Sequence, residues 1–205
     1  MPLRSLAMKQ FLPEDLIKFL TKTDEFLKAD CDLILIGGAA ASLAYGATKT
    51  TTDIDLATKL PGHLQEALKL ACEETGILIP VSYVGQFEPP YAFESRLKAI
   101  DGLKLDKLIL SVPERHDLAL MKIVRGYEND IQAIEEMHEV QPFYLEIFIE
   151  RFMTEMTQAI GNPNVIRLNF LLMTEKLFGS AVMKEVDTIT KDWAPLHPLD
   201  PSISR

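Results

Sequence analysis

The sequence predicts an α/β (α+β) protein in which a sheet with flanking helices is followed by a helical C-terminal part. Up to about residue 138, short apolar runs bounded by glycine or proline alternate with segments of helical periodicity. From Gln141 onward, apolar and aromatic residues recur at helical spacing. The composition, 47% hydrophobic and 25% charged over 205 residues, allows a substantial core. We therefore expect one domain over 1–138 and a helical region over 139–205 packed on it.

The first elements follow from periodicity and from residues that start helices or turns. Residues 12–27 form an amphipathic pattern with Pro13 near its start, which predicts a helix. The apolar run 33–36 predicts a buried strand. Gly37 and Gly38 then allow a sharp turn, and residues 39–43 favour a helix whose first N–H groups could face a phosphate.

The remaining elements are predicted by the same rules. Alternation and β-branched content predict strands over 53–56, 77–84, 93–100 and 107–112, and helical spacing predicts helices over 61–76, 118–124, 142–160 and 165–178. Pro80 is expected to bend its strand or to place it at an edge. Prolines at 195, 198 and 201 predict a loose tail.

Two carboxylates on one predicted strand carry the chemistry. Asp53 and Asp55 alternate with Ile54 and Leu56, so both carboxylates face one side of the strand. Adjacent buried carboxylates repel each other, and a hard divalent cation that also bridges substrate phosphates relieves this repulsion. The alternative is an exposed edge strand with two solvated aspartates.

The pattern from Gly37-Gly38 through Thr52-Asp53-Ile54-Asp55 resembles the signature of the DNA polymerase β-like nucleotidyltransferase superfamily. That signature is a glycine pair, a helix and loop, and Asp-x-Asp on the next strand. The segment is most similar to bacterial minimal nucleotidyltransferase-like proteins of the AbiE/MenA toxin type, and the likeness covers about residues 30–135. Those families often have a basic residue before the Thr–Asp pair, whereas this chain has Lys49 and three threonines and no arginine in that loop.

A second block, over 113–131, resembles the toxin segment that carries a functional lysine on a helix and then a functional aspartate. Lys122 and Asp130 fall on those two positions. Lys122 also interrupts a nearly apolar helix, so its amine must either reach water or find a partner. Gly126 lies between the two residues, and the sequence does not show whether they meet.

The resemblance implies a nucleotidyltransferase fold with a mixed sheet and the transfer of a nucleoside monophosphate from a nucleoside triphosphate. The implied cofactor is Mg²⁺ or Mn²⁺, and the implied acceptor is RNA (tRNA) or protein. The implied site residues are Asp53, Asp55, Lys122 and Asp130 for catalysis, Gly37, Gly38, Lys49 and Thr52 for the nucleotide, and Asp53, Asp55 and Glu94 for the metal. Asp106 is the other candidate for the third metal carboxylate, and Glu94 is preferred because it falls within a predicted strand.

Charge and composition limit the partners and the compartment. The net charge of −9 argues against nonspecific wrapping of nucleic acid. No apolar run is long enough to span a bilayer, and Cys31 and Cys72 lack metal-ligand spacing, so we expect a cytoplasmic protein with reduced thiols. His63 and His116 also lack metal-ligand spacing. A toxin–antitoxin role with a partner antitoxin protein follows only from the resemblance.

Two other functions remain open at this stage. The same fold could serve as a non-catalytic nucleotide-binding or partner-binding module, because a fold does not determine an activity. Asp-x-Asp also serves metal-dependent glycosyltransferases, although the glycine pair and helix directly upstream disfavour that reading.

Overall fold

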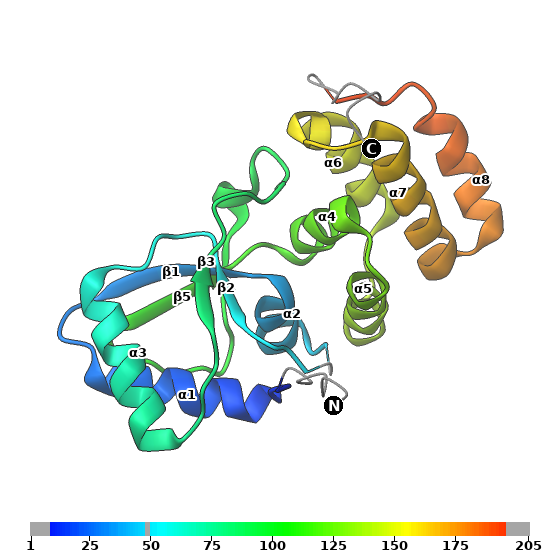
Figure 1. Cartoon of the computed structure of the whole chain (residues 1–205). Coiled ribbons are helices and arrows are strands. Elements are labelled where there is room, and N and C mark those ends of the chain that lie inside the picture. Colours follow the sequence, from blue (N-terminus) through cyan, green and yellow to red (C-terminus); the bar gives the residue numbers. More distant parts are fainter. Residues whose placement is uncertain (1–8, 48–49, 196–205) are drawn as a thin grey trace, which may run out of the picture.

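The computed structural model describes residues 9–47 and 50–195, which form two lobes (Figure 1). The first lobe contains the sheet and helices α1 (Pro13–Phe26), α2 (Gly37–Tyr45) and α3 (Gly62–Thr75). The second lobe contains α4 (Arg115–Arg125), α5 (Glu128–Val140), α6 (Leu145–Glu155), α7 (Pro163–Phe178) and α8 (Ser180–Ile189). Helix α2 contacts both α4 and α5, so it joins the sheet to the helical lobe.

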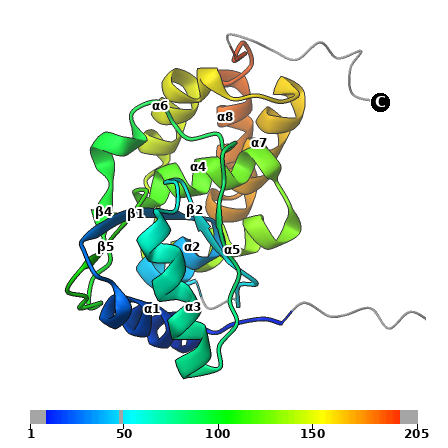
Figure 2. The same ribbon diagram turned by 60° about the vertical axis from the view of Figure 1, so that its left-hand side comes forward.

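The sheet has five strands in the order β3-β2-β1-β5-β4. The strands are β1 (Cys31–Ile36), β2 (Ile54–Leu56), β3 (Val81–Tyr83), β4 (Lys98–Ala99) and β5 (Leu108–Val112). Strand β1 runs parallel to β5 and antiparallel to β2, β2 runs parallel to β3, and β4 runs antiparallel to β5. Figure 2 shows the β4–β5 edge. The predicted α/β class with a mixed sheet and flanking helices is confirmed.

Alternation along the strands separates a core face from a polar face. Leu35, Ile54 and Leu56 are almost fully buried on the side that α1 and α3 cover. Asp55 points to the other side of the sheet, since it lies between Ile54 and Leu56 and pairs with Ile36 of β1. The polar face of β2 therefore meets the carboxyl end of β1, where α2 begins.

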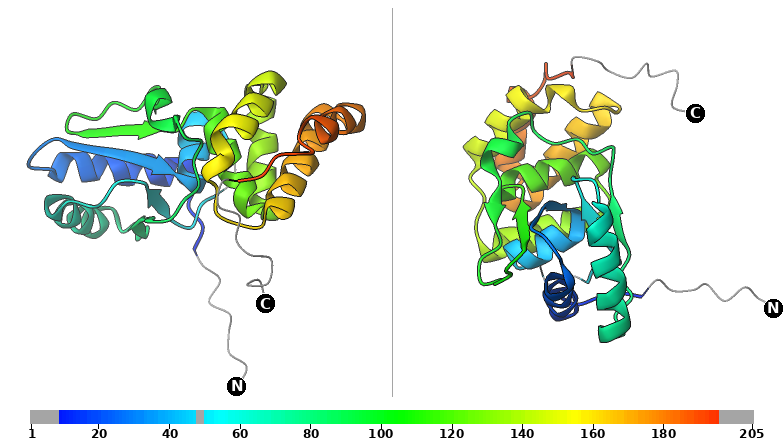
Figure 3. Two further views of the ribbon diagram at one scale, coloured as in Figure 1. Left: turned by 90° about the horizontal axis from the view of Figure 1, so that it is seen from above. Right: turned by 90° about the vertical axis from the view of Figure 1, so that its left-hand side faces the viewer.

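An aromatic core fills the second lobe. Phe152 of α6 stacks on Phe170 of α7 with ring centroids 4.0 Å apart, and Trp193 packs on the other side of Phe152 at 4.4 Å. Figure 3 shows α6, α7 and α8 at the opposite end of the molecule from α1 and α3. Within the described ranges, no helix combines the length and the apolar character needed to cross a lipid bilayer.

A buried ion network fixes the amino-terminal half of α4. Asp117 is fully buried and accepts two hydrogen bonds from the Arg96 guanidinium, at 2.8 and 3.0 Å. Arg151 of α6 donates to the same carboxylate at 2.9 Å and also pairs with Glu114, which caps α4. A second edge of the Arg96 guanidinium donates to Glu155 at the end of α6. This network ties α4 to α6 and to the segment that precedes β4.

Several predicted elements need correction. The strand predicted over 93–100 is wrong, because Phe93–Arg96 forms a 3₁₀ turn (η1) and only Lys98–Ala99 pairs as a strand. Arg96 causes this turn to dock on α4 and α6, which local alternation does not reveal. The strand predicted over 77–84 is limited to Val81–Tyr83, and α5 and α8 were not predicted. Of the prolines that predicted a loose tail, Pro195 is buried, whereas Pro198 and Pro201 lie outside the described residues.

The network around Asp117 should dominate the stability of the α4–α6 contact. Asp117→Asn leaves Arg96 and Arg151, both partly buried, short of negative charge, so we expect the free energy of unfolding to fall by about 3 kcal/mol. Asp187→Asn is the matched control, because Asp187 is half exposed and its pair with Arg167 should contribute less than about 1 kcal/mol. Urea unfolding of the two variants measures the difference, and equal losses would contradict the assignment.

Candidate functional site

The two aspartates of the Asp-x-Asp segment lie together in one cleft. Asp53 directly precedes β2, and Asp55 is its middle residue. Both side chains line a cleft with a volume of about 610 Å³, and both are half-buried. The Ser82 hydroxyl, directly across from Asp55 on β3, donates to the Asp55 carboxylate at 3.3 Å. The neighbouring strand thus offers a hydroxyl, and not a carboxylate, beside the aspartate pair.

Glycine is required at positions 37 and 38 because the backbone there passes close to the side chains of Asp55 and Thr51. Gly37 has a φ of +69°, and a Cβ atom there would lie 2.9 Å from Asp55 Oδ2. A Cβ atom on Gly38 would lie 2.9 Å from Thr51 Oγ1. Helix α2 begins at Gly37, two residues earlier than predicted, and no side chain in the described ranges caps its first turn. Its free N–H groups therefore open beside Asp55, where they suit an anion.

Burial and charge repulsion act together on Asp55. Its pKa is raised above the usual value, first by burial and then by the nearby Asp53 carboxylate. The hydrogen bond from Ser82 and the charges of Arg125 and Lys122 oppose this rise only in part. The ionised aspartate pair is therefore short of positive charge. A hard cation with substrate oxygens among its ligands would complete such a donor set, because Mg²⁺ is usually held by one or two carboxylates, waters and phosphates.

Lys122 and Asp130 meet, which the sequence alone did not show. Lys122 is 4% exposed, and its Nζ lies 3.1 Å from Asp130 Oδ1, while Arg125 donates to the same oxygen at 2.7 Å. Burial lowers the pKa of Lys122, although Asp130 opposes this. Among the described residues, Asp130 Oδ2 is buried without a hydrogen-bond partner. Both charged residues line the cleft that contains the aspartates.

A tight turn between α4 and α5 creates this pair. Gly126 ends α4 in the left-handed conformation, with a φ of +63°, and α5 then brings Asp130 back beside Lys122. Asn169 of α7 donates to the Ile123 carbonyl at 3.0 Å and would lie only 2.1 Å from a Cβ atom on Gly126. Only glycine fits at this corner, so the turn, the Asn169 contact and the Lys122–Asp130 pair form one unit.

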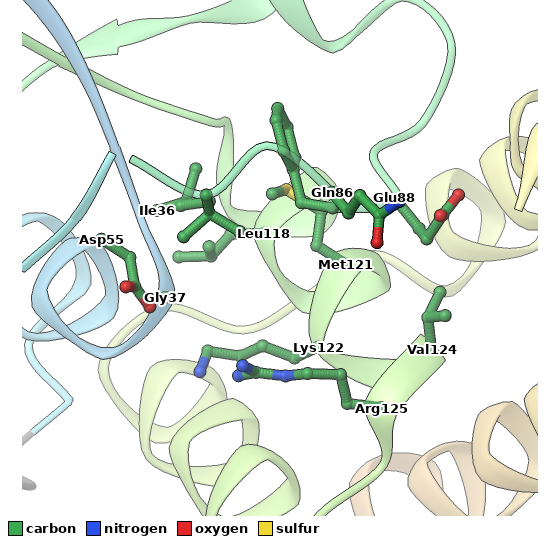
Figure 4. A pocket seen from close by; sticks show the side chains of 12 residues that line it. Ile36, Gly37, Asp55, Gln86, Glu88, Leu118, Met121, Lys122, Val124 and Arg125 are labelled. Atoms are coloured by element: carbon green, nitrogen blue, oxygen red, sulfur yellow. The ribbon is translucent and has the colours of Figure 1, made fainter. Parts of the chain in front are cut away.

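Two cavities meet at Asp55, Lys122 and Arg125, which line both of them. The first is the cleft, whose wall also includes Gly38 and Thr52. The second is a smaller apolar slot of about 140 Å³ that passes Gly37 and runs along α4 (Figure 4). An anionic ligand at the start of α2 could therefore extend into either space.

The predicted site residues have different outcomes. Gly37, Gly38, Thr52, Asp53, Asp55, Lys122 and Asp130 come together around the two cavities. Lys49 lies outside the described residues. The placement of Glu94 on a strand is wrong: it is exposed on η1, because Arg96 anchors this turn to Asp117 and Glu155. Within the described ranges, no three His, Cys, Asp or Glu side chains are placed to hold a metal ion.

Asp106, the other candidate for a third carboxylate, lies at the wrong end of the sheet. It is exposed just before β5, and its backbone N–H donates to Asp24 of α1 at 2.9 Å. The β1–β5 register pairs Cys31 with Leu108, so Asp106 precedes the amino end of β1, whereas Asp55 lies opposite Ile36 at the carboxyl end. Five residues of extended strand separate the two ends by roughly 17 Å.

Sequence reasoning missed several residues of the site. Ser82 escaped notice because its contact depends on the parallel pairing of β2 with β3, which leaves no local signal. Tyr127 is exposed at the cleft, with the Arg125 guanidinium 5.9 Å from its ring centroid. Gln10 reaches the cleft through the bridge that pairs Phe11 with Thr51. Arg125 is different, because its spacing of three positions from Lys122 predicts that it lies on a nearby face of the helix.

One comparison with known proteins gave a match. The family model described as "Nucleotidyltransferase of unknown function (DUF6036)" matches residues 14–176. This span contains the glycine pair, both aspartates and the Lys122–Asp130 pair, and it extends into α7. Neither the search of curated proteins nor the search of solved structures found a match.

The close approach at Gly37 predicts a specific loss of stability. Gly37→Ala adds a Cβ atom at a positive φ and against Asp55, so we expect a loss of at least about 1–2 kcal/mol. Gly62→Ala is the matched control, because Gly62 is also the first residue of a helix but has open space around it and should gain up to about 1 kcal/mol. Thermal unfolding of both variants measures the contrast. A tolerated alanine at position 37 would contradict it.

The raised pKa of Asp55 predicts the pH dependence of stability. Since the native carboxyl keeps its proton to a higher pH than the unfolded chain does, its contribution to the free energy of unfolding falls as pH rises above about 3.8. Asp55→Asn should therefore be more stable than the native sequence at pH 7, with the difference shrinking towards pH 3. Urea unfolding between pH 3 and 8 tests this, with Asp101→Asn, at an exposed turn, as control. Parallel profiles for the native chain and Asp55→Asn would refute it.

Proposed function

The chain belongs to the family of nucleotidyltransferases of unknown function DUF6036, and from that premise we propose that it moves a nucleoside monophosphate from a nucleoside triphosphate to an acceptor hydroxyl. The observation that carries the proposal is the convergence of Asp53 and Asp55, the uncapped start of α2 and the buried Lys122–Asp130 pair on one cleft. Carboxylates suit a cation, whereas the helix start and the lysine suit phosphate oxygens.

In this proposal, Asp53 and Asp55 hold Mg²⁺ (or Mn²⁺), which fits a carboxylate pair short of positive charge. When bound, the cation supplies charge that offsets the phosphate oxygens of the transferring group. The first N–H groups of α2, at Gly37 and Gly38, contact the phosphates. Thr52 lines the same cleft and adds a hydroxyl, and Lys49 is proposed as a further phosphate contact.

The reaction itself is an in-line displacement. The acceptor hydroxyl oxygen forms a bond to the α-phosphorus, the bond from that phosphorus to the bridging oxygen breaks, and pyrophosphate leaves with the electron pair. The acceptor proton passes to water in the open cleft. Lys122 stabilises the charge that develops on the phosphate oxygens, and Asp130 holds its amine in place. Catalysis then rests mainly on positioning and charge stabilisation.

The proposed acceptor and biological role follow from the resemblance of the sequence. We propose RNA (tRNA) or protein as the acceptor, and a role as the toxin of a bacterial toxin–antitoxin pair in the cytoplasm, because residues 30–135 resemble the AbiE/MenA type. The net charge of −9 favours a local contact with an RNA end over extended binding along RNA.

The alternative is a non-catalytic nucleotide-binding or partner-binding module on the same fold. Two observations favour it. No third carboxylate joins the aspartate pair within the described ranges, and Ser82 stands across from Asp55 on the neighbouring strand. Metal-dependent nucleotide binding without any transfer would support this alternative.

Substitution of the proposed catalytic residues should separate the two functions. Asp53→Ala and Lys122→Met should each lower Mg²⁺-dependent transfer of label from α-labelled triphosphates onto total tRNA or protein by about 10²–10³-fold. Lys122→Met preserves most of the side-chain volume, so its fold can be verified by the thermal unfolding curve.

Lys176→Met provides the control for this assay. Lys176 also pairs with an acidic residue of α5, Glu135, at 2.9 Å, but the pair is exposed and lies away from the aspartates. Its transfer rate should match the native rate. Transfer that persists in Asp53→Ala would exclude the proposed chemistry.

A further inference from the structure

The apolar slot beside α4 has a shape and a lining that contacts to the phosphates alone do not require. Its walls are the side chains of Ile36, Val84, Phe87, Leu118, Met121 and Val124. Its volume of about 140 Å³ admits a single planar ring system and excludes a folded acceptor. Protein interiors are normally closely packed, so an open space of this size at the edge of the proposed phosphate site calls for an occupant.

The two ends of the slot differ in chemistry. Asp55 and Lys122 lie at one end, where the slot meets the cleft, and Gln86 and Glu88 lie at the other end (Figure 4). One oxygen of Glu88 accepts the backbone N–H of Ile160 at 3.1 Å, which holds this carboxylate at the rim. A ligand that fits must therefore be apolar across its faces, polar along one edge, and joined to an anion at the other end.

A nucleoside triphosphate has this distribution of polarity, and so we propose that the slot binds its nucleobase, with Gln86 and Glu88 contacting the base edge. This inference rests on the proposed function, because it places the triphosphate at Asp53, Asp55 and the start of α2. The base lies between Phe87 and Val84 on one side and Met121 on the other. The acceptor then approaches through the larger cleft.

The carboxylate of Glu88 gives the slot a preference among bases. An ionised carboxylate only accepts hydrogen bonds, so it favours an edge that carries an exocyclic amino group. Adenine, cytosine and guanine have such a group, whereas uracil offers only its ring N3–H, flanked by two carbonyl oxygens that repel the carboxylate. Burial raises the pKa of Glu88, and an N–H donor from the base would offset this cost of keeping the carboxylate ionised.

The test measures binding, in Mg²⁺, of the four nucleoside triphosphates and of inorganic tripolyphosphate to the full chain by titration calorimetry. The native chain should bind ATP, CTP or GTP about tenfold or more tighter than UTP, as expected for a hydrogen bond to a charged group. Val84→Phe fills the slot, so it should weaken the favoured triphosphate about tenfold or more without changing the affinity for tripolyphosphate.

Glu88→Gln provides an isosteric second variant if Val84→Phe does not fold. The amide oxygen can keep the bond to Ile160, while the amide NH₂ replaces a carboxylate oxygen, so the preference should shift towards UTP. The controls are Val81→Phe, three residues before Val84 at the start of β3 but facing the groove between α1 and α3, and Glu73→Gln, also at that groove. Both controls should retain native affinities for every ligand.

The outcomes separate the slot from the proposed function. If Asp53→Ala loses triphosphate binding while Val84→Phe and Glu88→Gln bind all four triphosphates as the native chain does, the slot assignment is wrong and the phosphate site survives. If Val84→Phe raises only the KM for the acceptor, the slot holds the acceptor and the inference is overturned. If the native chain binds neither triphosphate nor tripolyphosphate, both the slot and the proposed function fail.

Discussion

The site depends on the cost of burying Lys122. Its ammonium is taken almost fully out of water and is compensated by Asp130, whose same oxygen also accepts Arg125. Burial disfavours the charged form of both Lys122 and Asp55, as the opposite shifts of their pKa values show. The Lys122 amine and the Asp55 carboxylate, which carry opposite charges, thus line the same cleft without neutralising each other fully. An arrangement of this kind is typical of functional sites, where a ligand supplies the missing charge.

Helix α4 carries Lys122, so the position of this lysine depends on how firmly α4 is held. Different contacts fix the two ends of the helix. The amino-terminal half is held by the ions around Asp117, which reach into α6 and η1. The carboxyl end is held by the Asn169 amide on the Ile123 carbonyl, at the corner that Gly126 makes. The helical lobe therefore positions Lys122, while the sheet positions the aspartates, and α2 lies between the two.

Local patterns in the sequence were sufficient wherever a short segment decides the structure. The strand that carries Asp55 and the helix around Lys122 appear close to where they were predicted, and α2 begins two residues early, because strand parity and helical spacing act over a few residues. Contacts between distant segments were not predictable in this way. Ser82 reaches Asp55 through strand pairing, and Glu94 lies on a turn because Arg96 binds residues of α4 and α6. Helix α5 does carry apolar residues at helical spacing, Ala133, Ile134 and Met137, although no helix was predicted there.

The position of Arg151 has a consequence for how this architecture can diverge. Arg151 belongs to α6, yet it neutralises Glu114 and Asp117 on the helix that carries Lys122. The charges of Glu114 and Asp117 at the start of α4 are therefore balanced by a residue that lies more than thirty positions later in the sequence. A recombination event that replaced the C-terminal helices would have to bring a cation to the same place, or lose the two acids at the same time. Inheritance of α4 and of the helices that follow it is coupled through this arginine, and the hydrophobic core is continuous between the sheet and these helices.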